Sequence, residues 1–164
     1  KGVLVLNQYT TQVGSVVNTV LHTGLTTATY TIAILNSASG SGSTDQRIAL
    51  ETTRWYKVSL ILPNIYVGSD HADSSFTIKL IQTVSSTDTT LGTFKIMRTN
   101  STAAGFFGGG VYSAVIDTGA GSATPHEFKA TITQTNRSGS ETYSVNADAT
   151  FPLQLMVEDV GTST

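Results

Sequence analysis

The sequence predicts an all-β fold, an antiparallel sandwich or barrel in which a jelly roll of two packed sheets is the favoured arrangement. Ten or eleven segments alternate apolar with polar residues, which is the period of a half-buried strand. Every window of helical period is interrupted by Gly, Pro or β-branched residues, whereas a parallel sheet would need helical crossovers. Threonine and serine are abundant while charged residues make up only 12%, which is typical of β-structure that presents hydroxyl groups to water.

The first half of the chain contains five expected strands, over residues 2–8, 15–22, 27–35, 47–52 and 54–62. The sequence NSASGSGSTD at 36–45 predicts a surface loop. In the strand RWYKVSLIL, the residues on the core side are Tyr56, Val58, Leu60 and Leu62. Pro63 follows at its end, where a missing amide donor is tolerated.

The second half begins with a predicted hairpin. Its first strand, SFTIKLIQT, turns Phe76, Ile78 and Leu80 to one side, and its second, TFKIMRT, does the same with Phe94 and Ile96. The intervening VSSTDTTLG supplies turn residues, and AAGFFGGG at 103–110 predicts a glycine-rich break. Further strands are expected at 111–119, 127–135 and 142–149, and the clearest alternation places Phe128, Ala130 and Ile132 in the core.

The final strand is expected over residues 151–161, FPLQLMVEDVG. Its core side would carry Phe151, Leu153, Leu155 and Val157, and its other side Gln154, Met156 and Glu158. A core strand placed so close to the end of the chain favours a domain at the distal tip of something longer, suited to display rather than chemistry. The first residue is Lys1 rather than methionine, which suggests a piece of a longer polypeptide.

Length and composition exclude several classes of protein. A chain of 164 residues fits one domain with a substantial core, and the absence of cysteine excludes disulfides and thiolate-bound zinc. The formal net charge is −2 and the nine Lys and Arg residues are scattered, so nucleic acid is not an expected partner. No apolar run reaches the roughly 20 residues of a membrane-spanning helix, and the segment KGVLVLNQY is too short and too quickly polar to fit a signal peptide.

Four apolar side chains fall on strand faces opposite to the predicted core: Ile61, Ile81, Met97 and Met156. Two interpretations stay open for them. They are either ordinary exposed aliphatic residues or residues that line a subunit interface.

The candidate chemical sites each have a simpler structural interpretation. Asp70, His71 and Asp73 could hold a divalent cation, but a turn of this composition favours aspartate without a metal. Adjacent carboxylates at Glu158 and Asp159 point to opposite faces of a strand and do not converge as a glycosidase pair would. No histidine lies near a G-x-S-x-G elbow, and GFFGGG lacks the Lys of a phosphate-binding loop. We therefore expect no catalytic activity, no metal and no cofactor.

Three segments of the chain, in order, resemble the C-terminal domains of tail-fibre or minor tail proteins of actinobacteriophages. They follow Arg54, which opens the central strand, and comprise His126–Lys129 as H-x-[FY]-K, Val145–Ala149 as V-x-[AL]-x-[AS], and Pro152–Gly161 as P-x-x-L-x-V-E-D-[IV]-G. The resemblance covers the second half well and the first half loosely, and the terminal VEDVG is its most specific part. The loops around 36–45 and 100–110 are longer than the family pattern.

The resemblance implies a TNF-like jelly roll that forms a homotrimer at a phage tail tip or side fibre and is part of the virion. Its expected partners are copies of itself, other tail proteins and a glycan or protein of the host cell envelope. Exposed aromatic and amide side chains in loops suit such contact, and the candidates are Asn64, Tyr66, Asp70, His71, Phe106 and Phe107. Two other functions stay open: a carbohydrate-binding module of a secreted bacterial protein, and a capsid-decoration domain.

Overall fold

The fold is all-β and antiparallel throughout the part of the chain that the structure describes. This structure is a computed structural model, and it describes residues 11–19, 21–35, 48–68, 74–98, 104–120, 125–137 and 142–163. All regular secondary structure within these ranges is β-strand, which confirms the predicted fold class. The strands are β1 (Thr11–Asn18), β2 (His22–Leu25), β3 (Thr29–Leu35), β4 (Ile48–Ala49), β5 (Arg54–Leu62), β6 (Ile65–Val67), β7 (Ser74–Val84), β8 (Thr87–Arg98), β9 (Gly105–Phe107), β10 (Gly110–Asp117), β11 (Pro125–Arg137), β12 (Tyr143–Val145) and β13 (Leu153–Thr162).

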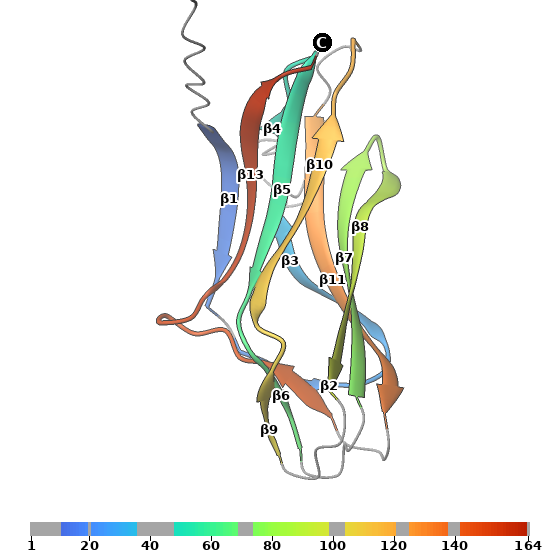
Figure 1. Cartoon of the computed structure of the whole chain (residues 1–164), viewed down its shortest axis with the longest axis vertical. Helices are drawn as coiled ribbons and strands as arrows, with labels where there is room; N and C mark the ends of the chain where they lie inside the picture. The colour runs from blue at the N-terminus through green and yellow to red at the C-terminus, as the bar shows by residue number, and fades with distance from the viewer. Residues whose placement is uncertain are drawn as a thin grey trace, which may run out of the picture.

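Two large sheets run along the long axis of the molecule (Figure 1). The first sheet has the strand order β1-β13-β5-β10, and the second has the order β3-β11-β7-β8 with the short β4 beside β11. All pairings in both sheets are antiparallel. Because neighbours in space are distant in sequence, most of the fold depends on long-range pairing rather than on hairpins.

A third, smaller sheet continues the first sheet beyond a break. Its order is β2-β12-β6-β9. Along the chain, β2 follows β1, β12 precedes β13, β6 follows β5 and β9 precedes β10. The two sheets therefore place corresponding strands in the same order from one edge to the other. The break falls at Pro63–Asn64 between β5 and β6, at Gly108–Gly109 between β9 and β10, and at residues 146–152 between β12 and β13. Pro63 cannot donate a ladder hydrogen bond, and Gly108 has a φ of 74°, a conformation that favours glycine. Figure 1 shows the smaller sheet at one end of the molecule, with residues 146–152 projecting from its side.

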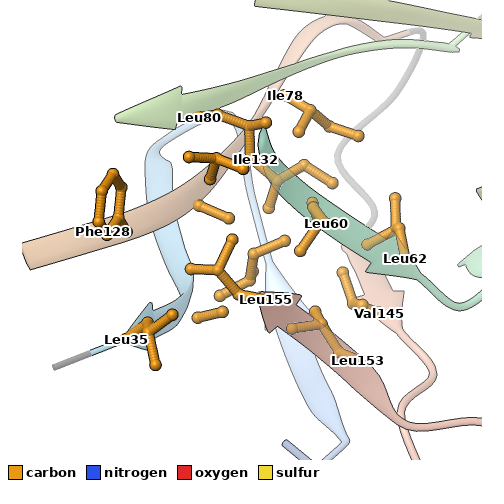
Figure 2. Packing of buried hydrophobic residues seen from close by; sticks show 14 of the residues in the cluster. Leu35, Leu60, Leu62, Ile78, Leu80, Phe128, Ile132, Val145, Leu153 and Leu155 are labelled. Carbon is orange, nitrogen blue, oxygen red and sulfur yellow. The ribbon is translucent and has the colours of Figure 1, made fainter. Parts of the chain in front are cut away.

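The core lies between the two large sheets and is built from alternate residues of the strands. The predicted faces of β5 and β11 are confirmed, since Val58 and Leu60, like Phe128 and Ile132, are fully buried. In Figure 2, Leu60 and Leu155 of the first sheet face Ile132 and Leu80 of the second. Full burial of such a side chain contributes about 1.5–3 kcal/mol, so packing across this interface stabilises the fold.

The β7–β8 hairpin is confirmed, but its turn is shorter than expected. Ser85 and Ser86 alone connect the strands, with φ values of 48° and 66°. Two successive positive φ values define the type I′ geometry that matches the twist of antiparallel strands. The pairing therefore extends to Val84 and Thr87, and residues 87–92 are strand rather than turn.

Several other boundaries were predicted wrongly. The segment expected at 15–22 is divided between β1, which ends at Asn18, and β2, which begins at His22, and the strand expected at 47–52 is only Ile48–Ala49. The short strands β2, β6 and β9 were missed because three or four residues are too few to establish a period. Phe151 was placed in the core, yet it is 68% exposed and β13 starts at Leu153. The segments 2–8 and 36–45 lie outside the described residues.

Candidate functional site

A groove lies at the break between the first sheet and the smaller sheet. Its volume is about 460 Å³, within the usual range for small-molecule sites. The walls come from three breaks that are distant in sequence. They are formed by Ile61, Leu62, Pro63, Asn64, Gly109, Gly110, Thr150, Phe151, Pro152 and Gln154.

One wall of the groove is the projecting segment 146–152, whose shape is fixed by Asp148. The Oδ1 atom of Asp148 accepts hydrogen bonds from the backbone N–H groups of Thr150 and Phe151, both at 2.7 Å. The Asp148 N–H donates in turn to the carbonyl oxygen of Phe151 at 3.2 Å. On either side of this turn Ala147 and Leu153 are anchored in the core. The turn therefore holds the Phe151 ring out of the core and against the groove.

A second hollow of about 220 Å³ adjoins the groove and is lined by Asn64, Phe106, Asn146, Asp148 and Phe151. Asn64 and Phe151 line both cavities. A backbone hydrogen bond also joins the segment at Asn146 to the segment at Asn64, since the Asn146 N–H donates to the Asn64 carbonyl oxygen at 3.0 Å. Because the two hollows share Asn64 and Phe151, we treat them together and call them the break groove.

Two aromatic rings lie side by side at the Phe106 end of the break groove. Tyr66 and Phe106 are direct partners in the β6–β9 pairing, and their ring centroids are 5.1 Å apart at an interplanar angle of 56°. Their neighbours Ile65 and Val67 are fully buried, so alternation along β6 turns Tyr66 outward. Phe106 is 59% exposed. Together with Phe151, these rings give the depression an exposed aromatic border.

Glycine at position 109 allows the Asn64 side chain to occupy the groove wall. A Cβ atom at Gly109 would lie 2.7 Å from Asn64 Oδ1, closer than side chains tolerate. Asn64 is exposed, and no hydrogen bond joins its amide group to another described residue. The amide is thus available to a ligand.

The outer face of the first sheet is the second feature of interest, because it carries several exposed or half-buried apolar side chains among polar ones. One cross-strand row runs Val111–Ile61–Gln154–Val17. The next row runs Ser113–Ser59–Met156–Ser15, and the row beyond it carries Val115 beside Lys57 and Glu158. Val111 is 62% exposed, and Val17 and Val115 are also more than half exposed. We call Val17, Ile61, Val111, Val115 and Met156 the apolar face.

The outer face of the second sheet has a different chemistry. Its middle rows pair Thr131 with Lys79 and Thr133 with Thr77, and Lys79 with Thr93 on the next strand. Lys129 on the same face is paired with Asp88 at 2.7 Å, and this contact lowers the pKa of the Asp88 carboxyl group. These hydroxyl and ammonium groups are well hydrated, and the same face also carries Ile34, Ile81 and the exposed Met97.

The structure gathers three of the six predicted contact residues at the break groove. Asn64 and Phe106 line it, and Tyr66 packs against Phe106. Phe107 lies on β9 opposite Ile65, although its side chain is not among those described. Asp70 and His71 lie outside the described residues.

The four predicted interface residues are divided between the two outer faces. Ile61 and Met156 belong to the apolar face, on neighbouring strands β5 and β13. Ile81 and Met97 lie on β7 and β8 of the second sheet, where Ile81 is paired with Lys129. A single flat contact therefore cannot use all four.

The terminal carboxylates serve separate partners, as their alternation on the strand predicts. Glu158 pairs with Lys57 at 3.5 Å, and Asp159 accepts from Nε of Arg54. The residue that opens β5 is thereby joined to the VEDVG segment, which gives both a structural role. Within the described ranges, no group of three or more His, Cys, Asp or Glu side chains is placed to hold a metal ion.

Phe151 is the site residue that the sequence interpretation missed, because it continues the alternation of Leu153, Leu155 and Val157 in phase. A local signal was present. Asp148 followed by two small residues favours a turn closed by its side chain, and Pro152 lacks the amide needed inside a paired strand. These two residues together place Phe151 outside the strand.

Comparison with known proteins adds no family to this description. Neither a protein-family model nor a curated protein sequence matches the chain. None of the described residues forms a helix long and apolar enough to cross a membrane.

Proposed function

We propose that this chain is a non-enzymatic jelly-roll domain that assembles into a homotrimer through the apolar face. In this proposal it is the distal domain of a phage tail fibre or minor tail protein, located in the virion, where it contacts other tail proteins and the host cell envelope. The observation that carries the proposal is the apolar face itself.

The order of the strands supports the jelly-roll arrangement. If β4 is set aside, the two large sheets contain eight strands, β1, β3, β5, β7, β8, β10, β11 and β13. If these eight strands are numbered from one to eight along the chain, the order across the first sheet is one-eight-three-six and the order across the second is two-seven-four-five. Strands close in sequence thus alternate between sheets as in two nested Greek keys, which is the topology of a jelly roll.

The contrast between the outer faces supports assembly through the first sheet. Val111 and Ile61 are direct partners in one row, and Val17 lies in the same row beyond Gln154, so these side chains are gathered on one face. Exposed apolar side chains gathered on one face of a domain favour a site of interaction. The number of subunits, three, comes from the resemblance to tail-fibre domains.

Light scattering on two single variants tests this assembly. Val111→Glu places a charge on the apolar face, whereas Met97→Glu places the same charge at a comparably exposed position on the second sheet, 68% against 62% exposed. The wild-type chain and Met97→Glu should be trimeric at micromolar concentration, and Val111→Glu should shift toward the 17.2 kDa monomer. A monomeric wild-type chain, or dissociation caused only by Met97→Glu, would contradict the proposal.

The break groove favours a second function, a carbohydrate-binding module of a secreted bacterial protein. Exposed Phe106 and Phe151 beside the Asn64 amide are the observations in its favour. Such a module would bind sugar as a monomer, so the same light-scattering experiment separates it from the first proposal. A capsid-decoration domain is distinguished by the position on the virion at which antibodies against the chain bind.

A further inference from the structure

We infer that the break groove binds a neutral oligosaccharide. This inference names the ligand class for the attachment role proposed above and rests on that role for its biological meaning. The groove shares Ile61 and Gln154 with the rows of the apolar face, so the sugar site is placed at its other end, at the hollow lined by Asn64, Phe106, Asn146, Asp148 and Phe151.

The aromatic border supplies apolar contact area of the kind that a sugar ring uses. The face of an aromatic ring carries negative charge density, and the C–H groups on one side of a pyranose ring are weakly positive. Phe106 and Phe151 both line the hollow of 220 Å³ and are 59% and 68% exposed. A chain that leaves two phenylalanine rings in water beside the same cavity favours a partner that covers them.

The polar groups among the rings suit hydroxyl groups. The Asn64 amide offers two donors and an acceptor, and Gln154 and Thr150 add an amide and a hydroxyl to the same lining. Asp148 uses Oδ1 for the backbone of the turn, while Oδ2 makes no hydrogen bond to a described residue and can accept from a sugar hydroxyl. Donors and acceptors are therefore both present, as a hydroxyl requires.

The charge of the lining distinguishes neutral from acidic sugars. Among the described residues that line the two hollows, Asp148 is the one ionisable residue and none is lysine or arginine. An anionic glycan would meet a carboxylate without a compensating cation, which costs binding energy. A neutral glycan meets no such penalty.

The groove is organised before binding. Tyr66 and Phe106 are held in register by the β6–β9 pairing, and Phe151 is held by the turn at Asp148. A preformed site loses less conformational entropy on binding. A lower entropy cost is important when each saccharide contact is weak. In an assembly, several such sites acting together raise the overall avidity.

Titration of the full chain with defined sugars, followed by NMR, tests the inference. The probes are soluble β-1,4-glucan, α-1,6-mannan and β-1,4-galactan hexasaccharides, plus a hexagalacturonate as the anionic arm. At least one neutral hexasaccharide should bind saturably and shift the amide signals of residues at the break groove, and the hexagalacturonate should not. Phe106→Ala and Phe151→Ala should each weaken binding about tenfold or more.

Trp55→Ala is the matched control, since Trp55, like Phe106 and Phe151, is an exposed aromatic residue, but it lies on β5 away from the groove. It lies six residues before Ile61, the first groove residue of the strand, which is roughly 20 Å along the strand. Its removal should change the affinity by less than about twofold. Because Phe106 and Phe151 are exposed, their removal should leave the circular dichroism spectrum unchanged.

Three results would overturn the inference. The first is that no neutral hexasaccharide binds at millimolar concentration, and the second is that Phe106→Ala and Phe151→Ala both bind as tightly as the wild-type chain. The third is that Phe151→Ala changes the oligomeric state, which would mean that a second copy of the chain occupies the break groove. A trimer that binds no sugar contradicts this inference alone. A monomer that binds a neutral sugar contradicts the proposed assembly alone.

Discussion

The turn at Asp148 allows the most detailed prediction, because its contacts are local and few. Asp148→Ala removes the acceptor of two backbone hydrogen bonds, each 2.7 Å long. Hydrogen bonds to a charged group contribute about 1.5–3 kcal/mol when buried. Asp148 is exposed, so we discount that value and expect about 1–2 kcal/mol for the pair together. Because Ala147 and Leu153 remain anchored in the core, the loss should be confined to the turn.

Amide hydrogen exchange measured by NMR provides the assay for this loss. A cost of about 1–2 kcal/mol corresponds to roughly 5- to 30-fold faster exchange at the amides of Thr150 and Phe151. Amides in the centre of β13, such as that of Leu155, should be unaffected. Asp148→Asn keeps an oxygen acceptor and should retain most of the protection. Equal exchange rates at Thr150 and Phe151 in wild type and Asp148→Ala would refute the role assigned to this carboxylate.

Three further predictions concern the core, the break and the pH dependence of stability. Ile78 is fully buried while Lys79 is exposed. Thermal unfolding should therefore show that Ile78→Ala lowers the free energy of unfolding by about 2–4 kcal/mol and Lys79→Ala by less than about 0.5 kcal/mol. Equal effects would mean that the two faces of β7 are assigned wrongly. Gly108→Ala introduces a side chain at a positive φ and places its Cβ only 2.8 Å from Ile96 Cγ2. Gly24→Ala is also at a positive φ, but its Cβ has no atom within 4 Å. Denaturant titration should therefore find the Gly108 variant less stable than the Gly24 variant, and equal stability would exclude the Ile96 contact. Burial lowers the pKa of His126 below its ordinary value of 6.5, so the unfolded chain binds a proton that the folded chain does not. The free energy of unfolding should therefore fall as the pH drops below about 6.5. His126→Gln should remove this slope between pH 5 and 7, and an unchanged slope in that variant would contradict the assignment.

Strand faces were predictable from sequence where the alternation was long and uninterrupted. Leu60 and Ile132 could be assigned to the core because the period of a strand is a local property. The final strand shows the limit of this reasoning. Phe151 continues the phase of Leu153, and only the turn formed by the Asp148 side chain separates it from the strand. A period alone cannot detect such a contact.

The break groove could be predicted only in part. Asn64, Tyr66 and Phe106 were recognisable as exposed aromatic and amide candidates near turn residues. Their convergence was not predictable, because Tyr66 and Phe106 become neighbours through the pairing of two three-residue strands. The division of Ile61 from Ile81 between opposite outer faces likewise depends on which sheet each strand joins. Sequence alone does not contain that information in any local form.

The central claim is that copies of the chain cover the apolar face, and the rate of cysteine labelling tests it most directly. The chain has no cysteine, so Val111→Cys and Met97→Cys each provide a single thiol, at positions 62% and 68% exposed within one subunit. At micromolar concentration the account predicts that a maleimide reagent modifies the thiol at position 111 at least about tenfold more slowly than the thiol at position 97, and that dilution below the dissociation constant removes the difference. Equal labelling rates at all concentrations would contradict it.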